Sequence, residues 1–165
     1  IVDVFRRAGV TVDLASVEES LEVMSSHQVT VIADMRIADC MDESYDLIAL
    51  PGGIPGVNNL QKSELLKKLL EKQNREDKLY GGICAAPAVV LEHHGLLEGK
   101  NATCHPGFVE RLQSAEYAGE AVVFHKNCVT GKGAGVSIDF ALELLGILMG
   151  EEKKREVAKG MALDI

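Results

Sequence analysis

Short apolar runs alternate with segments of helical periodicity along most of the chain. The runs are rich in β-branched residues and are bounded by glycine, proline or polar residues, which is typical of buried strands. They lie at residues 10–17 (VTVDLASV), 29–34 (VTVIAD), 46–53 (DLIALPGG), 78–84 (KLYGGIC) and 101–104 (NATC). We therefore predict a strand at each of these five places.

The segments between and after the runs predict helices. Leucines at positions 65, 66, 69 and 70 follow Ser63, and this spacing indicates a helix that the serine caps. Residues 86–99 predict a helix that stops at Gly95, because glycine commonly ends helices. Further on, Ser137 is expected to cap an apolar helix that runs to Gly150. Residues 151–160 (EEKKREVAKG) predict a solvated helix.

The alternation of strands and helices also predicts the fold class. Consecutive βαβ units imply a mainly parallel sheet with helices on both faces. We therefore predict one α/β domain over residues 1–165, with a flavodoxin-like, doubly wound sheet. Residues 121–131 (AVVFHKNCVTG) predict a β-hairpin insert that turns at Lys126 and Asn127.

The first residues do not fit a complete sheet. Residues 1–9 (IVDVFRRAG) have the pattern of the second half of a helix that ends at Gly9, and such a helix normally follows a first strand near the middle of a doubly wound sheet. Without that strand its neighbours would expose backbone groups, each costing about 1–3 kcal/mol when buried and unpaired. We therefore expect a preceding segment, either a separate cleaved chain or sequence upstream of Ile1.

Composition and charge exclude several classes of function. The net charge of −8 and the lack of a basic cluster argue against a nucleic-acid partner. The most apolar stretch, residues 136–150, contains Asp139 and Glu143, so we expect no membrane span. The four cysteines form no C-x-x-C pair, which favours reduced thiols in an intracellular compartment and argues against a zinc site. We predict no metal and no cofactor.

One cysteine has a position that suggests chemistry. Cys84 lies between a predicted buried strand and a helix that starts at Ala-Ala-Pro, as the nucleophile does in a nucleophile elbow. Free N–H groups and the helix dipole at that point favour a thiolate. The alternative is a structural role, because free cysteines are among the most buried residues. The spacing leaves both interpretations open.

Three longer segments carry a resemblance to a known family. They are residues 50–56 (LPGGIPG), 81–106 (GGICAAPAVVLEHHGLLEGKNATCHP) and 129–150 (VTGKGAGVSIDFALELLGILMG), and RRAG at residues 6–9 adds to them. In this order they resemble the ThiJ/PfpI superfamily, and they fit best its DJ-one branch, the parkinsonism-associated protein deglycase and its plant and microbial relatives. The resemblance implies a flavodoxin-like sandwich, a homodimer and a reactive cysteine, which is Cys84 in this chain.

The resemblance also implies roles for other residues. The loop LPGG supplies the amide of Gly53, which with the amide of Ala85 would hold an oxyanion. The family histidine corresponds to His105, which would move protons. The family glutamate that bonds the cysteine would fall about six residues before Ile1 by alignment with the family pattern. In the glycine-rich loop at residues 131–136 (GKGAGV), Lys132 occupies the position where the family has arginine, so a bidentate carboxylate contact would be lost.

The reaction that these roles imply is a glyoxalase reaction without a cofactor. The Cys84 thiolate would add to glyoxal or methylglyoxal, and His105 would move protons until glycolate or lactate leaves. The same chemistry on a sugar-modified amine or thiol would be deglycation. Two other classes stay open: a redox sensor or chaperone without turnover, and a cysteine amidase or peptidase. We expect the protein in the cytoplasm, with a plastid or another organelle also open.

Overall fold

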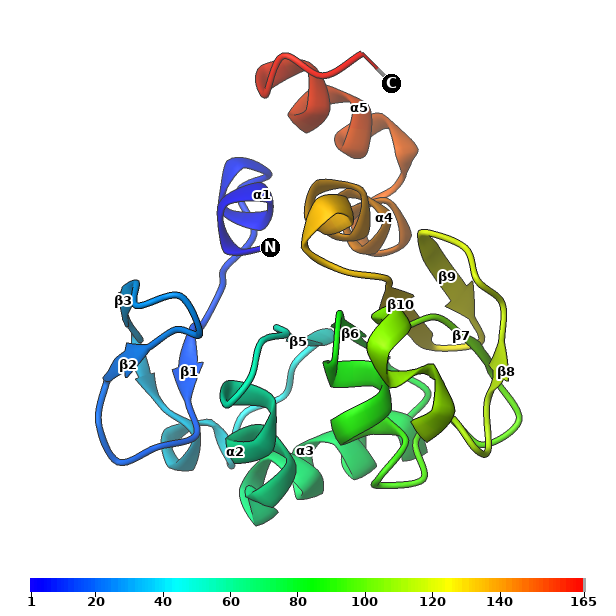
Figure 1. The fold of residues 1–165 in the computed structure, drawn as a ribbon. Coiled ribbons are helices and arrows are strands. Elements are labelled where there is room, and N and C mark those ends of the chain that lie inside the picture. The colour runs from blue at the N-terminus through cyan, green and yellow to red at the C-terminus, as the bar shows by residue number, and fades with distance from the viewer. Residues whose placement is uncertain (165) are drawn as a thin grey trace.

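A four-stranded sheet lies at the centre of the protein, between two layers of helices (Figure 1). The computed structural model describes residues 1–164. The strands of this sheet are β5 (Leu47–Leu50), β6 (Leu79–Ile83), β10 (Cys128–Gly131) and β9 (Val122–His125), in that order. β5, β6 and β10 are parallel, and β9 pairs antiparallel with β10. The fold is the predicted α/β class with a mainly parallel sheet.

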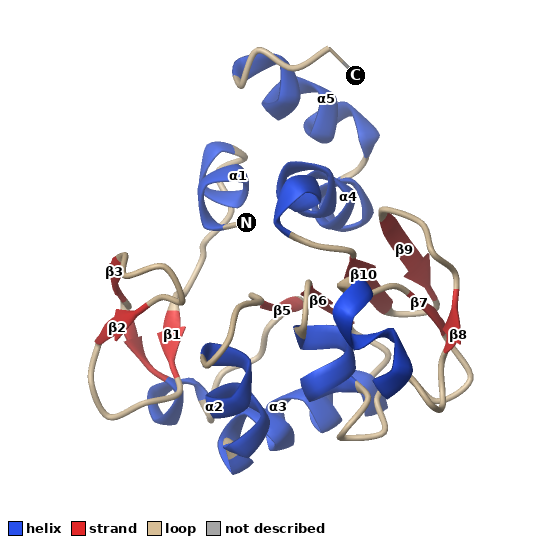
Figure 2. Cartoon of the chain, in the orientation of Figure 1, coloured by secondary structure: helices blue, strands red, loops and turns tan. Residues whose placement is uncertain are grey.

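The helices divide between the two faces of the sheet, as Figure 2 shows by colour. One layer holds α1 (Val2–Arg7), α4 (Ser137–Met149) and α5 (Glu151–Gly160). The other layer holds α2 (Gly56–Lys62), α3 (Glu64–Arg75) and a π-helix at Pro87–Leu91. Single turns of 3-10 helix lie at Ile37–Cys40, Pro106–Arg111 and Ala134–Val136. Each layer covers one apolar core.

β6 separates these two cores. All five of its residues are buried, and their side chains alternate between the faces. Leu79 and Ile83 pack with α1, α4 and α5, whereas Tyr80 packs with α2 and α3. At Gly81 a Cβ atom would lie 2.4 Å from the Val129 carbonyl oxygen of the neighbouring strand, so only glycine fits there. A strand buried on both faces is what the apolar run at residues 78–84 predicts.

Most of the local signals that the sequence carries are confirmed. Ser63 caps α3, its hydroxyl accepting a hydrogen bond from the Leu66 amide at 3.3 Å. The predicted hairpin forms as β9 and β10, and because β10 also pairs with β6, it is built into the main sheet. Ser137 was expected to cap α4, but this is wrong: its hydroxyl donates to the Ala134 carbonyl 2.8 Å away, in the turn that precedes the helix.

Three predicted strands form only in part and lie outside the main sheet. Of residues 10–17, only β1 (Ala15–Ser16) is paired, with β4 (Met35–Arg36). Residues 29–34 contain β3 (Thr30–Ile32), in an exposed hairpin with β2 (Glu22–Met24). Residues 101–104 contain β7 (Asn101–Ala102), which pairs with β8 (Glu116–Tyr117). Strand propensity was correct in each place, but the extent of a strand depends on the partner that the fold brings beside it.

Candidate active site

Cys84 occupies a sharp turn directly after β6. Its φ of +65° lies in the left-handed region, which residues other than glycine rarely adopt and which costs about 1–3 kcal/mol. The chain then turns through Ala85 and Ala86 into the π-helix at Pro87–Leu91. Cys84 itself is half-buried. This is the strained strand-to-helix turn that the sequence predicts, and it keeps the thiol at the end of the sheet.

Two backbone hydrogen bonds hold the turn in place. The Cys84 amide donates to the carbonyl of Gly131 at 2.8 Å, where β10 ends. The Cys84 carbonyl accepts from the amide of His105 at 2.8 Å. The second bond ties two residues that are 21 positions apart in the sequence, so the fold brings the predicted cysteine and histidine together.

His105 precedes the 3-10 helix at Pro106–Arg111 and its side chain is exposed. Its Nδ1 accepts a hydrogen bond from the Gly107 amide at 3.1 Å. Since Nδ1 accepts, a neutral ring carries its proton on Nε2. The ring also contacts Phe108 edge to face, with 6.0 Å between centroids. His105 therefore offers an N–H donor at Nε2 in the neutral state.

The loop after β5 lies against Cys84. A Cβ atom at Gly52 would be 2.5 Å from the Cβ atom and 3.2 Å from the Sγ atom of Cys84. Gly53 has a φ of +93°, and a Cβ atom there would lie 3.1 Å from the Ser26 hydroxyl. The sequence reasoning assigned a role to Gly53 but missed Gly52, although the double glycine in LPGG was the signal for such a close approach.

The two amides expected to hold an oxyanion are free to donate. Among residues 1–164, neither the Gly53 amide nor the Ala85 amide donates to a hydrogen-bond acceptor. Gly53 is half-buried, and Ala85 is buried directly beside Cys84. Amides that have no hydrogen-bond partner beside a nucleophile can donate to an oxyanion and so stabilise its negative charge. Their joint use as an oxyanion hole stays a prediction.

The thiols of Cys104 and Cys128 differ from that of Cys84. Burial and the nearby Cys84 raise the pKa of Cys104 to about 11. Burial raises the pKa of Cys128 to about 12, against the opposing effect of the Lys100 ammonium. A thiol with a raised pKa stays protonated below that pKa, and the protonated form is a poor nucleophile. Cys104 is fully buried, and its Sγ lies 3.4 Å from the His105 carbonyl oxygen as a weak donor.

These differences predict selective alkylation. At pH 7.5, iodoacetamide should modify Cys84 at least about 10 times faster than Cys104 or Cys128, because Cys84 is partly exposed, whereas the other two thiols are buried and their burial raises their pKa. The rates are measured by peptide mass mapping over time. Modification of Cys104 in native protein at the rate of Cys84 would contradict the assignment.

Other polar side chains noted in the sequence have structural partners. The Lys132 ammonium donates to the Gly119 carbonyl at 3.1 Å and so fastens the loop before β9. His94 Nε2 lies 3.1 Å from the Gln61 carbonyl oxygen, and burial lowers the pKa of this histidine. His125 Nδ1 accepts from the Asn101 amide at 2.7 Å. None of these contacts involves Cys84.

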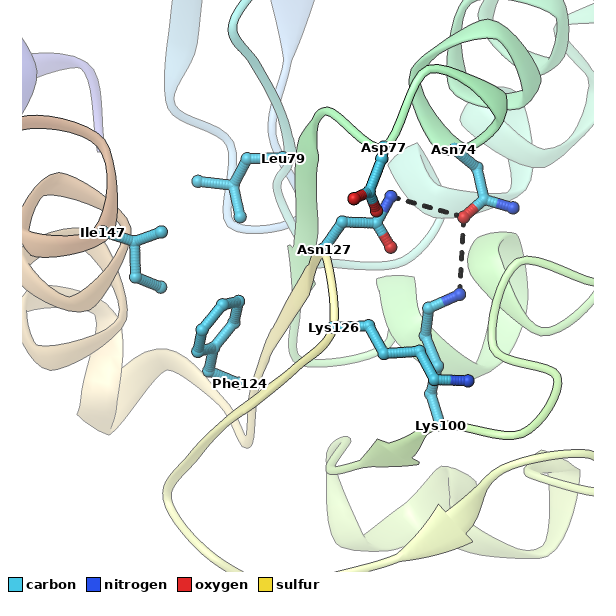
Figure 3. A pocket seen from close by; sticks show the side chains of 8 residues that line it. All are labelled: Asn74, Asp77, Leu79, Lys100, Phe124, Lys126, Asn127 and Ile147. Carbon is cyan, nitrogen blue, oxygen red and sulfur yellow. Dashed lines mark hydrogen bonds between the residues drawn. The ribbon is translucent and has the colours of Figure 1, made fainter.

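A polar cavity of about 550 Å³ lies at the other end of the sheet, where β6 begins (Figure 3). The side-chain oxygen Oδ1 of Asn74 there accepts from the Lys100 ammonium and from the side-chain Nδ2 of Asn127, each at 3.4 Å. The Lys100 ammonium also donates to the Leu96 carbonyl at 3.1 Å. These groups bind one another and tie α3 to the β9–β10 turn, which gives them a structural role.

Within residues 1–164, no three His, Cys, Asp or Glu side chains gather as metal ligands would. None of the helices described over these residues combines the length and the apolar character that a membrane crossing requires.

Comparisons with known proteins give a consistent result. The sequence profile of the DJ-1/PfpI family matches residues 1–146. The chain is 40% identical over 159 residues to Protein DJ-1 homolog B of Arabidopsis thaliana, a match that covers 96% of the chain and 36% of that protein. It is 30% identical over 163 residues to Glutathione-independent glyoxalase DJR-1.2 of Caenorhabditis elegans, covering 98% of the chain and 86% of that protein. The chain thus spans little more than a third of the plant relative.

A comparison with solved structures leads to the same family. The structure of oxidized Toxoplasma gondii DJ-1 superposes with a TM-score of 0.96 at 36% identity, covering 99% of this chain and 89% of that chain.

Proposed function

Because the chain belongs to the DJ-1/PfpI family, we propose that it is a cofactor-independent glyoxalase that converts glyoxal or methylglyoxal to the hydroxy acid at Cys84. The observation that carries the proposal is the strained, half-buried Cys84 held by a backbone hydrogen bond to His105. One relative that is 30% identical is named a glutathione-independent glyoxalase, which supports the same reaction class.

The reaction begins with addition of the thiolate. The Cys84 sulfur forms a bond to the aldehyde carbon, and the electrons of the carbonyl π bond move to its oxygen. In the proposed reaction the Gly53 and Ala85 amides, which are free to donate, would hold the resulting hemithioacetal oxyanion. No metal is needed at this stage, since backbone dipoles supply the positive charge.

The next steps move protons and add water. A proton leaves the former aldehyde carbon and another is added to the neighbouring carbon, so that the first is oxidised to a thioester and the second is reduced to an alcohol. Water then cleaves the thioester, which releases the hydroxy acid and restores the Cys84 thiol. The sum is one 2-oxoaldehyde and one water giving one hydroxy acid. No external oxidant or reductant takes part.

In the proposed reaction His105 carries these protons. In the neutral ring Nε2–H can donate to an oxygen of the substrate. For Nε2 to accept a proton, the ring proton must move to Nδ1, which breaks the bond from the Gly107 amide. The ring is exposed, so water can replace that hydrogen bond and the free energy of the tautomer change is small.

The direct test is turnover by the purified protein. Incubation with methylglyoxal should produce lactate, measured itself by chromatography, because loss of the aldehyde alone does not show conversion. Burst release of chromophore from an amide substrate would instead favour the amidase. Protection of an unfolding client protein with no lactate formed would favour the chaperone. Absence of lactate under conditions where the fold is intact would reject the glyoxalase proposal.

We further propose that the protein forms a homodimer through the β2–β3 hairpin. Five large apolar side chains of this hairpin and its flanks are exposed: Leu21, Met24, Val29, Val31 and Ile32. A cluster of this kind on a small hairpin is typical of an interface. Light scattering should show a dimer for the wild type and a monomer for Ile32→Lys. Phe124→Lys, which changes an exposed apolar side chain of β9, is the matched control and should stay a dimer. A monomeric wild type would contradict this.

The cytoplasm remains the compartment that we propose. All four cysteines are free, and a reactive thiol such as Cys84 persists best where the surroundings are reducing.

A further inference from the structure

The polar cavity where β6 begins has one charged side and one apolar side (Figure 3). The charged groups on its lining belong to Asp77, Lys100 and Lys126. The apolar side chains of Leu79, Phe124 and Ile147 face them across the cavity. A molecule held there would meet charge at one end and hydrocarbon at the other.

Lys100 is a buried lysine without an acidic partner. Only 7% of this residue is exposed, and no Asp or Glu side chain among residues 1–164 forms an ion pair with it. Its ammonium donates to the Leu96 carbonyl at 3.1 Å and to Asn74 Oδ1 at 3.4 Å, which occupies two of its three N–H groups. These oxygens are neutral, so they satisfy hydrogen bonds but leave the positive charge uncompensated. A buried charge of this kind is costly unless it is paired.

The groups around Lys100 do not supply the missing negative charge. Cys128 is close, but burial raises the pKa of this thiol to about 12, so it is neutral at pH 7. The Tyr80 ring, whose centroid is 5.7 Å from the ammonium, offers only the attraction of its π face. The Asp77 carboxylate is exposed, so water screens its charge. Burial accordingly lowers the pKa of Lys100, against the opposing effect of Asp77.

Lys126 brings a second positive charge to the same place. Its ammonium donates to the carbonyl of Gly99, the residue directly before Lys100, at 3.1 Å. Its φ of +58° lies in the left-handed region that favours glycine, so the β9–β10 turn carries backbone strain with lysine at this position. Two neighbouring ammonium groups repel each other, and an anion between them would turn this repulsion into attraction.

We propose that this cavity binds a small carboxylate that carries a short apolar group. The carboxylate would accept from the remaining N–H groups of Lys100 and Lys126, and the apolar group would cover Phe124 and Ile147, which are 48% and 36% exposed. Two ammonium groups against the single carboxylate of Asp77 leave one net positive charge on the lining, which favours a singly charged ligand over inorganic phosphate. Cys84 does not line this cavity, so the inference is independent of the proposed reaction.

Calorimetric titration with 4-methylpentanoate tests the proposal. At about 50 mM salt, where exposed charges are little screened, we expect one site with a Kd of about 1 mM or lower. Lys100→Met keeps the length of the side chain without its charge and should weaken binding at least about 10-fold. Lys159→Met changes the net charge equally on exposed α5 and should bind as the wild type does. Wild-type affinity in Lys100→Met, or no binding by the wild type up to about 10 mM ligand, would overturn the proposal.

A second set of measurements guards against loss of the fold and identifies the ligand class. Lys126→Met alters an exposed side chain and should weaken binding at least about 3-fold, so it tests the site even if Lys100→Met does not fold. Phe124→Ala should also weaken binding at least about 3-fold, because the apolar group loses its cover. Inorganic phosphate and 4-methylpentan-1-amine should each bind at least about 10-fold more weakly than 4-methylpentanoate. Equal binding of phosphate would overturn the role of the apolar group, and equal binding of the amine would overturn that of the carboxylate.

Discussion

Replacement of Cys84 by alanine is expected to lower kcat/KM for methylglyoxal by at least about 10³-fold, with no lactate above the rate without protein. The proposed reaction needs a bond from sulfur to the aldehyde carbon, and no other thiol among residues 1–164 is placed to form it. Cys104 is fully buried and Cys128 is nearly so, and burial raises the pKa of both.

The comparison must separate loss of the nucleophile from loss of the fold. The loss of packing in Cys84→Ala should be small, since Cys84 is only half-buried against the core under α1 and α4. Cys40→Ser serves as the matched control, because Cys40 is a free cysteine whose sulfur contacts Met35 and the Arg36 carbonyl, and this variant should keep the wild-type activity. Lactate is measured together with the melting temperature of each variant. Unchanged turnover by Cys84→Ala would remove this residue as the nucleophile.

Gly52→Ala is expected to reduce activity about 10- to 100-fold and to lower the free energy of unfolding by about 1–3 kcal/mol. The new Cβ atom would lie 2.5 Å from the Cβ atom of Cys84 and 2.9 Å from the Ile83 carbonyl oxygen, so either the loop or the elbow must move. Such a displacement would move the neighbouring Gly53 amide, which the proposed reaction uses as an oxyanion donor. The same change at Gly56, where no atom lies within 4 Å, should change stability by less than about 1 kcal/mol.

The measurements for Gly52→Ala are kcat, KM and the urea denaturation midpoint. If the loop that contains Gly52 and Gly53 serves only the fold, the denaturation midpoint will fall while kcat of the folded protein stays at the wild-type value, and the role of this loop at Cys84 would be rejected. A fall in kcat larger than the loss of folded protein supports the close approach that the structure shows.

Features that depend on neighbouring residues in the chain could be predicted. The cap at Ser63, the buried strand β6 and the turn at Lys126 each follow from a pattern a few residues long. Cys84 belongs to the same group, because an apolar strand followed by Ala-Ala-Pro places it at a turn. The capping role of Ser137 failed because α4 begins at Ser137 itself, so that Val136 occupies the cap position, and the Ser137 hydroxyl donates back to the Ala134 carbonyl.

What the sequence by itself determined is therefore the order of strands and helices, the fold class and the cysteine at the elbow, since backbone propensity and apolar periodicity act over short distances. Only the tertiary structure decided which strands share a sheet, that the His105 amide bonds to the Cys84 carbonyl, and that Gly52 lies against the thiol. These contacts join segments that are far apart in the chain. They form because the whole molecule buries its apolar surface in one arrangement, which short local patterns do not specify.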